Sequence, residues 1–275
     1  MKFCLISDVH ADLRKWSWSE FEDQIDSPTL VVAGDISNYI DDTCKWIADA
    51  KNHFKNVVWV AGNHDFYNSG FHQTRLIDPN SAQSRLLYPR TVDQIIDHYR
   101  QWSEKHSIHF LHRDSVLIDG VRFIGCTGWH DFIAGEPYTT EVQIQTWLSL
   151  NDKVILWADD QRCPDHMFPL KQAIADAEYL TDAVDASQEP TVIVTHHLPH
   201  RSLKWDRPED PIWTKQHGGF VNTKMEKIIN KNIKFWCYGH THQRGMKDIN
   251  GITYVCNSRG YWHENHNWQF ISLEI

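Results

Sequence analysis

The chain has 275 residues and a formal net charge of −9 when histidine is counted as neutral. Its length allows one large domain or two small ones with a substantial core. The acidic balance argues against a broad nucleic-acid-binding surface, although a local basic pocket is compatible with it. No stretch approaches the ~18 consecutive apolar residues of a membrane span, so we expect no membrane-embedded segment.

The six cysteines show no Cys-x-x-Cys spacing, which predicts reduced and mostly buried thiols. The apolar run at residues 1–6 is too short for a signal peptide and leads directly into an expected strand. These two features together predict a cytoplasmic protein.

Three short apolar runs in the first sixty residues predict strands over 2–7, 29–33 and 56–60. Residues 39–52 have helical spacing of apolar side chains, with Ile40 and Ile47 on one face. Strands that alternate with helices through short connections indicate a parallel α/β core.

An antiparallel portion of sheet is expected in the middle of the chain, where Asp119 and Gly120 form a strong hairpin signal. The last two apolar runs are expected to close a second sheet. The remaining expected elements are helices over 91–106, 170–184 and 222–230, and strands over 108–112, 115–118, 121–126, 190–195, 234–238, 252–256 and 268–273.

Residues 66–90, 127–164 and 199–221 are irregular in pattern, and the latter two are rich in aromatic side chains. Residues 127–164 are interpreted as an insertion that covers or rims a site, because loops of this length are usually functional or disordered. A satellite hydrophobic cluster under a long loop explains them equally well. No convincing domain boundary appears, so residues 1–275 are treated as a single domain.

The sequence Gly-His-Thr-His at 239–242 follows the expected strand over 234–238. Along extended backbone the two imidazoles would share a face, and Gly239 would let the backbone turn tightly. Imidazole is the commonest metal-binding side chain. Such a pair alone is weak evidence, since a polar loop would explain it about as well.

Potential metal ligands follow five of the expected strands. Because sites in α/β sheets form at the carboxyl edge of the strands, these side chains should lie together. Taken singly, each has an ordinary alternative, such as a turn aspartate or a satisfied buried histidine. Taken jointly, those alternatives require five coincidences. The candidate ligands are Asp8, His10, Asp35, Asn63, His196, His240 and His242.

Seven mixed oxygen and nitrogen ligands are too many for one ion and suit two ions that share a carboxylate. Such a pair serves phosphate-ester cleavage, because it clamps the attacking and leaving oxygens and lowers the pKa of a bound water to about 7. The departing oxygen needs a proton, and His64 is the best candidate general acid. The ligand types fit Mn, Fe, Zn or Co, with Mn favoured and Mg less apt.

These motifs, in this order, resemble those of calcineurin-like metallophosphoesterases: Asp-x-His, Gly-Asp, Gly-Asn-His-Asp, a strand-end His and Gly-His-x-His. The resemblance spans residues 8–242. It implies a four-layer α/β-β/α sandwich with a two-metal site. It further implies one metal on Asp8, His10, Asp35 and His242, another on Asp35, Asn63, His196 and His240, and His64 as the leaving-group acid that also touches the phosphate.

The chain departs from the protein-phosphatase branch of that family. Asn38 stands where that branch has a carboxylate to orient the acid histidine, and the adjacent arginine is absent. A Ser/Thr protein phosphatase is therefore not expected. Asn38 could hydrogen-bond His64 without stabilising its cation, which should weaken the acid.

The ending Asn-Ser-Arg-Gly-Tyr at 257–261 resembles a bacterial and phage subgroup of uncharacterised phosphoesterases, as does Gly-Cys-Thr-Gly-Trp at 125–129. Arg259 is a candidate phosphate contact, because guanidinium binds phosphate in bidentate fashion; a solvent-exposed turn arginine is the alternative. His197 and His200 are expected to point away from the site or to line its rim.

The sequence thus predicts a metal-dependent phosphohydrolase that acts on a phosphate monoester or diester of a small molecule or nucleotide. Membranes and extended nucleic acids are not expected partners. A nuclease acting on short or single-stranded nucleic acid is the alternative within the enzyme class, because tryptophans can stack on bases. A non-catalytic scaffold with the same fold is the alternative from another class, although a scaffold would be expected to lose ligands.

Overall fold

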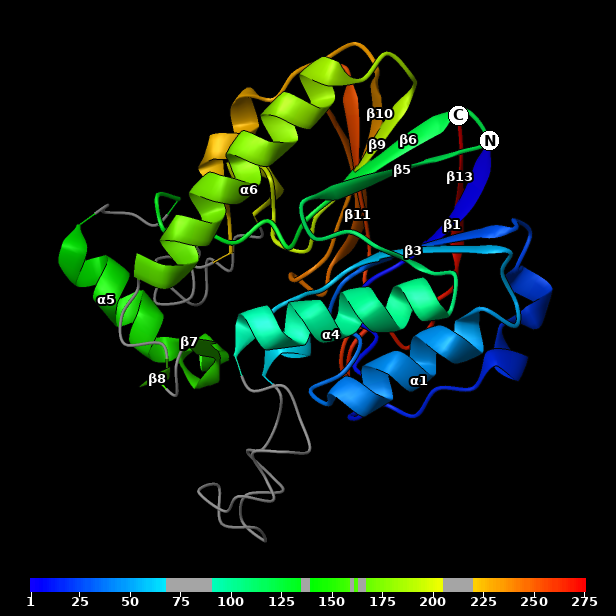
Figure 1. The fold of residues 1–275 in the computed structure, drawn as a ribbon, viewed down its shortest axis with the longest axis horizontal. Helices are drawn as coiled ribbons and strands as arrows, with labels where there is room; N and C mark the ends of the chain where they lie inside the picture. The colour runs from blue at the N-terminus through cyan, green and yellow to red at the C-terminus, as the bar shows by residue number, and fades with distance from the viewer. Residues whose placement is uncertain (68–90, 135–138, 159–160, 163–166, 205–219) are drawn as a thin grey trace, which may run out of the picture.

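Two β-sheets pack face to face with helices on the outside of each, as the ribbon in Figure 1 shows. The computed structural model describes residues 1–67, 91–134, 139–158, 161–162, 167–204 and 220–275. Most of the expected irregular segments 66–90 and 199–221 lie outside these residues. None of the helices in the described ranges is long and apolar enough to cross a membrane.

The first sheet has the strand order β13-β1-β2-β3-β4. Its strands are parallel except for β13, which pairs antiparallel with β1. Two helices run along its outer face (Figure 1). The elements are β1 (Lys2–Ile6), β2 (Thr29–Ala33), β3 (Asn56–Val60), β4 (His109–Phe110) and β13 (Ile271–Glu274), with helices α1 (Ile40–Ala50) and α4 (Val92–Lys105).

The second sheet has the order β11-β12-β10-β9-β6-β5. Its four central strands are parallel, and an antiparallel strand closes each edge. One long helix covers its outer face (Figure 1). The elements are β5 (Asp114–Ile118), β6 (Val121–Gly125), β9 (Thr191–Val194), β10 (Ile233–Tyr238), β11 (Arg244–Ile249) and β12 (Ile252–Asn257), with helix α6 (Met167–Ala186).

Shorter elements occupy the connections, and α5 lies beside the small sheet of β7 and β8 at one side of the sandwich (Figure 1). They are α5 (Thr140–Ser149), β7 (Leu156–Ala158), β8 (Gln161–Arg162) and the 3₁₀ helices η1 (Trp18–Glu20), η2 (Glu22–Gln24), η3 (His64–Phe66), η4 (Asn151–Val154), η5 (Arg201–Leu203) and η7 (Thr223–Lys227).

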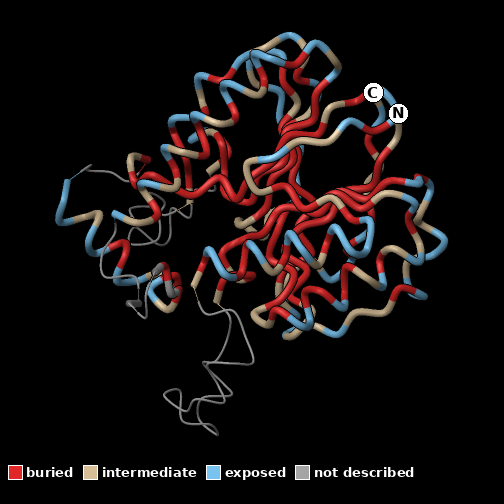
Figure 2. Tube along the Cα trace, viewed as in Figure 1, coloured by how far each residue is buried: buried red, intermediate tan, exposed pale blue. Residues whose placement is uncertain are grey.

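The core is layered because side chains alternate along the buried strands. On β1, Phe3 and Leu5 join the cluster between the two sheets, whereas Cys4 and Ile6 face the helices of the first sheet. A third cluster, which includes Trp236, packs the second sheet against α6. The central strands of both sheets are therefore buried on both faces, as the red centre of Figure 2 shows. This is the predicted four-layer α/β-β/α sandwich.

Three expectations need correction. The last strand is β13, which pairs with β1 in the first sheet and not in the second, because an apolar run does not specify its partner. Residues 222–230 form only the short 3₁₀ helix η7. The helix and strands that were not predicted are α5, β7 and β8, in the segment read as irregular, and β11, an exposed polar edge strand without an apolar pattern.

Candidate metal centre

The two sheets meet at the carboxyl ends of their strands. Ser7, just after β1, donates its backbone N–H to the carbonyl of Asn257 at the end of β12 (3.2 Å). Arg259 donates its own backbone N–H back to the carbonyl of Ser7 (2.9 Å). These bonds join the loop after β1 to the loop after β12. Ligands that follow strands of either sheet are thereby brought to one place.

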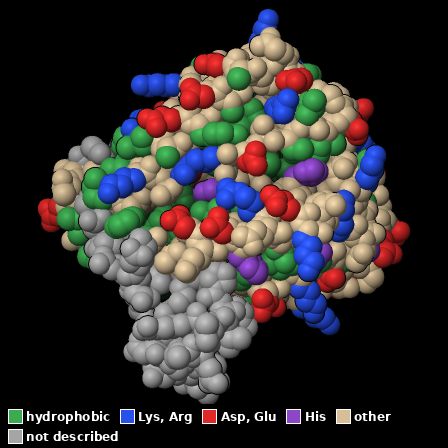
Figure 3. Space-filling view, viewed as in Figure 1, with side chains coloured by type: hydrophobic (Ala, Val, Ile, Leu, Met, Phe, Trp, Pro, Cys, Tyr) green, Lys and Arg blue, Asp and Glu red, His purple; other side chains and the backbone are tan. Residues whose placement is uncertain are grey.

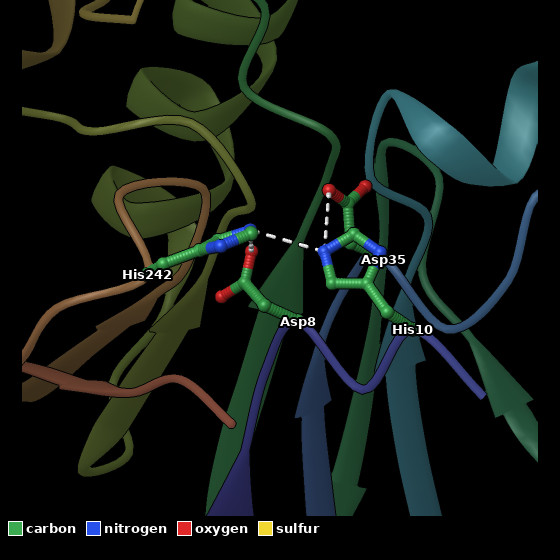
Figure 4. Close-up of side chains that lie close together, drawn as sticks. All are labelled: Asp8, His10, Asp35 and His242. Carbon is green, nitrogen blue, oxygen red and sulfur yellow. Dashed lines mark hydrogen bonds and ion pairs between the residues drawn. The ribbon is translucent and has the colours of Figure 1, made fainter. Parts of the chain in front are cut away.

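Four predicted ligands form a first group: Asp8, His10, Asp35 and His242. Figure 4 shows their side chains pointing toward one another from loops that belong to both sheets. The Nε2 atoms of His10 and His242 are 3.0 Å apart. His242 Nε2 lies 3.7 Å from Asp8 Oδ1, and His10 Nε2 lies 3.9 Å from Asp35 Oδ2.

The other predicted ligands form a second group beside the first. The amide oxygen of Asn63 lies 3.1 Å from His196 Nε2 and 3.1 Å from His240 Nδ1. Those two ring nitrogens are 3.2 Å apart. Asp35 Oδ1 lies 3.3 Å from His196 Nε2. Asp35 therefore belongs to both groups, with one carboxylate oxygen toward each.

The pKa shifts of His10, His240 and Asp35 suit cation binding. Burial lowers the pKa of His10 and of His240 well below the usual value, which leaves neutral imidazoles with a free lone pair. Burial alone would raise the pKa of Asp35, but the nearby His196 and His64 hold it well below its usual range. Facing imidazole nitrogens beside carboxylate oxygens are the donor set that divalent transition metals prefer. The residues present fit two such ions sharing Asp35.

Hydrogen bonds behind the ligands fix how the rings are turned. His196 Nδ1 donates to the carbonyl of Ala33 (2.9 Å), so its Nε2 faces the second group. His242 Nδ1 lies 2.6 Å from a carboxylate oxygen of Glu264, which leaves its Nε2 for the first group. Metal-binding histidines usually have such a partner, which sets the tautomer and raises the basicity of the ligating nitrogen.

Five of the seven predicted ligands have left-handed backbone, namely Asp8, His10, Asp35, His240 and His242, with φ between 44° and 70°. Side-chain-bearing residues seldom adopt this conformation, and it is concentrated at functional sites. The extended backbone expected for 239–242 is therefore wrong. This is why His240 and His242 point into different groups and not to one side.

Two glycines are required by close approach. A Cβ on Gly62 would lie 2.1 Å from Asp35 Oδ1, and one on Gly239 would lie 2.8 Å from Asp8 Oδ2. A methyl group at either position would displace a ligating carboxylate. Gly239 was expected to serve a tight turn, but its own φ is not in the left-handed region.

His64 stands beside both groups. Its backbone N–H donates to Asp35 Oδ1 (2.9 Å), and its Nε2 lies 3.9 Å from Asp35 Oδ2. Its Nδ1 donates to the amide oxygen of Asn38 (2.6 Å), as the sequence suggested. The amide nitrogen of Asn38 in turn donates to Asp12 Oδ2 (2.8 Å). A carboxylate is thus present, but one residue further from the imidazole than in the protein-phosphatase branch.

Asp65 is a supporting residue that the sequence reasoning missed. Its buried carboxylate accepts backbone N–H groups from Asp35, Ile36, Ser37 and Gly62. It therefore ties the loop after β2 to the loop after β3, and so places Asp35 beside Asn63. The available signal was its position as the last residue of Gly-Asn-His-Asp.

A pocket of about 300 Å³ opens over the two groups. One part of its wall consists of Asp35, His64 and His240. Another part consists of Ser149–Asp152. These belong to the segment 127–164 that was expected to cover or rim a site, here called the covering segment. Asp152 is buried, and its Oδ1 accepts hydrogen bonds from Asn63 Nδ2 and Tyr67 Oη, each at 2.8 Å. It therefore orients the amide oxygen of Asn63 toward His196 and His240. No motif pointed to Asp152, because it reaches the site from an irregular segment.

Arg259 does not lie in this pocket, and the predicted phosphate contact is corrected. Its buried guanidinium donates to the carbonyls of Val9, Arg14 and Lys15 and lies over the ring of Trp16. Burial and the neighbouring Arg14 lower the pKa of Arg259 to about 9. It braces the loop that carries Asp8 and His10.

His197 and His200, which lie near the ligand His196 in the sequence, differ in their placement. His200 accepts the backbone N–H of Ser202 at the start of η5 and is partly exposed. His197 is fully buried and lies against His130 and His240, so it is not on the rim.

A sequence model of the calcineurin-like phosphoesterases matches residues 1–244. The chain belongs to this family. This calcineurin-like phosphoesterase is therefore a metal-dependent hydrolase of phosphoester bonds, and the scaffold alternative is set aside. The predicted family and the predicted enzyme class are both confirmed.

Two known proteins are similar to this phosphoesterase over most of its length. An uncharacterized protein, L509 of Acanthamoeba polyphaga mimivirus, is 24% identical over 260 residues, which is 91% of this chain and 85% of that protein. The solved structure of phosphopantetheinyl hydrolase from Mycobacterium tuberculosis superposes with a TM-score of 0.70 at 16% identity, covering 98% of this chain and 95% of the other. The latter likeness shows that the whole fold is shared.

Proposed function

We propose that this phosphoesterase hydrolyses the phosphate ester of a small molecule at a centre of two divalent ions. The carrying observation is that the donor atoms gather in two groups that share Asp35, directly under a pocket of about 300 Å³. Asp8, His10, Asp35 and His242 would hold one ion, and Asp35, Asn63, His196 and His240 the other. Manganese is our first choice, because carboxylate, amide and imidazole ligands all suit it.

When bound, two such ions neutralise phosphoryl charge and make a water acidic enough to attack near neutral pH. The chain's own residues supply position and a proton. His64 donates Nδ1–H to Asn38, so Nε2 is the nitrogen that faces the centre. We assign Nε2 of His64 the protonation of the departing oxygen, which is the predicted role.

Several observations favour a small substrate over a nucleic-acid strand. The pocket volume is at the lower end of the range for small-molecule sites. Its wall combines aromatic side chains, Tyr67 and Tyr261, with the cation Lys204. On the face shown in Figure 3, basic and acidic side chains are interspersed and form no continuous basic stripe. The solved relative is named as a phosphopantetheinyl hydrolase.

The test is a series of aryl and alkyl phosphates whose leaving groups range from acidic to weakly acidic. The variant His64→Ala should lose about 10²–10⁴-fold in kcat/KM on the poorest leaving group and much less on nitrophenyl phosphate. This pattern follows because only a poor leaving group needs a proton. Bound metal, measured by elemental analysis, should stay at the wild-type level.

His106→Ala is the matched control, since His106 is exposed at the end of α4. That variant should behave as wild type throughout the series. An equal loss of His64→Ala on all leaving groups would contradict the acid role, because a purely positional effect does not depend on leaving-group acidity.

A further inference from the structure

A third cluster of metal-binding side chains lies beside the two-ion centre. It consists of His130, Asp152 and His197, which expose at most 2% of their surface. One ligand atom of each lies within 4.8 Å of the others. His130 follows β6, Asp152 belongs to η4 and His197 follows β9, so three separate segments of the chain meet here.

The two histidine rings of this cluster are buried, and the Asp152 carboxylate that pairs with His130 lies beyond hydrogen-bond distance at 3.6 Å. Within the described residues, none of the four ring nitrogens of His130 and His197 makes a hydrogen bond. A buried polar group left unpaired costs about 1–3 kcal/mol, so native structures seldom leave two whole imidazoles in this state. A cation would use one nitrogen of each ring.

Asp152 supplies the anionic ligand. Its Oδ1 is already occupied by Asn63 and Tyr67. Its Oδ2 lies 3.6 Å from His130 Nε2, which is too long for a hydrogen bond. It is close to the separation of roughly 3.4 Å that two ligands have on tetrahedral zinc with bonds near 2.1 Å.

Consecutive histidines serve different clusters. His196 and His197 lie in a bend after β9, where both backbone N–H groups donate to the carbonyl of Thr127. Their ring planes are 89° apart. His196 Nε2 faces Asp35, whereas the ring of His197 lies against Trp129 and His130.

We propose that His130, Asp152 and His197 bind a third metal ion, and that zinc is the ion that suits them. Two imidazoles and one carboxylate are a zinc ligand set, with the fourth position left for water. This ion ties the covering segment to β9. It is distinct from the two-ion centre, because none of its ligands belongs to either of the first two groups.

Metal counting on the full chain tests this site. Protein stripped with a chelator, reloaded with Zn²⁺ alone and desalted should retain three equivalents. His130→Gln should retain two. Asp35→Asn, which damages the shared carboxylate of the other centre, should retain one. His112→Gln is the matched control and should retain three, because His112 also has a buried unpaired ring nitrogen but lies outside the cluster.

Two equivalents in the wild type would overturn the proposal, and so would three equivalents in His130→Gln. If a variant fails to fold, anomalous X-ray scattering at the zinc edge on the wild type decides. A peak between His130, Asp152 and His197 supports the site, and its absence contradicts the site. Failure here leaves the two-ion hydrolase intact, since that function is measured separately by ester hydrolysis.

Discussion

The loops at the strand ends and the covering segment, which lies within residues 127–164, both shape the two-ion centre but do so in different ways. The strand-end loops are locked by backbone bonds, by left-handed residues and by glycines that leave no room for a side chain. The covering segment contributes through one carboxylate, Asp152, whose oxygen holds the amide of Asn63. The strand-end loops carry the ligands of the centre, whereas the covering segment orients one of them, Asn63.

This difference predicts a ranking of damage. A change in the strand-end loops should remove ions altogether, because the ligands there are held by backbone hydrogen bonds and close packing within those loops. A change in the covering segment should weaken metal binding and leave the metal ligands in place.

Gly62→Ala should abolish hydrolysis and remove both ions of the centre. The new Cβ would lie 2.1 Å from Asp35 Oδ1, and the shared carboxylate would have to move. Gly245→Ala is the matched control, because a Cβ there meets nothing within 4 Å. Metal content and turnover of the two variants should be measured together. A Gly62→Ala protein with normal metal content would show that the loop can shift to accommodate the added methyl group.

Asp152→Ala should weaken activation by Mn²⁺ about 10- to 100-fold, the usual cost of losing a partner behind a ligand. The amide of Asn63 would lose the acceptor at 2.8 Å that orients it. Asp152→Asn keeps an oxygen that can accept this bond and should restore most of the affinity. The measurement is activity against Mn²⁺ concentration. Equal losses in both variants would mean that the charge matters and not the hydrogen bond.

Glu264→Gln should weaken Mn²⁺ activation by about 10-fold, at the lower end of the same range. The carboxylate of Glu264 lies 2.6 Å from His242 Nδ1, and its hydrogen bond and charge raise the pKa of His242 against the effect of burial. A neutral amide would still hold the ring but would make its ligating nitrogen less basic. Unchanged activation by Mn²⁺ would mean that Glu264 lines the pocket but does not contribute to metal binding through His242.

Arg259→Met should leave KM unchanged and lower thermal stability. The guanidinium braces backbone carbonyls and does not line the pocket, so its loss leaves buried acceptors unpaired at about 1–3 kcal/mol each. Arg100→Met, at an exposed helical position, should change neither. Thermal unfolding and substrate titration measure the two effects. A raised KM at normal stability would restore the original prediction of a phosphate contact.

The centre could be predicted from sequence because its ligands are short motifs at the ends of recognisable strands. Asp8, Asp35 and His196 each follow an apolar run, and the parallel arrangement of those runs determines where they meet. Neither the strand pattern nor the motifs predict contacts made by residues in segments that lack a regular sequence pattern. Asp152 reaches Asn63 across a separation of 89 residues.

Arg259 shows the opposite failure. Its motif was recognised, but a motif does not state which way a side chain points, and three carbonyls that became available only on folding bind it. The partner of β13 was misassigned for a related reason, since pairing depends on which strand edge remains open.

The central claim is that two ions sharing Asp35 carry the hydrolysis. The most direct measurement compares chelator-stripped wild type with Asp35→Asn on a phosphate monoester and a phosphate diester as Mn²⁺ is added back. The account predicts that wild-type activity disappears on stripping and returns with Mn²⁺, whereas Asp35→Asn stays inactive at every concentration. Recovery of Asp35→Asn to wild-type rates at saturating Mn²⁺ would contradict the shared-carboxylate centre.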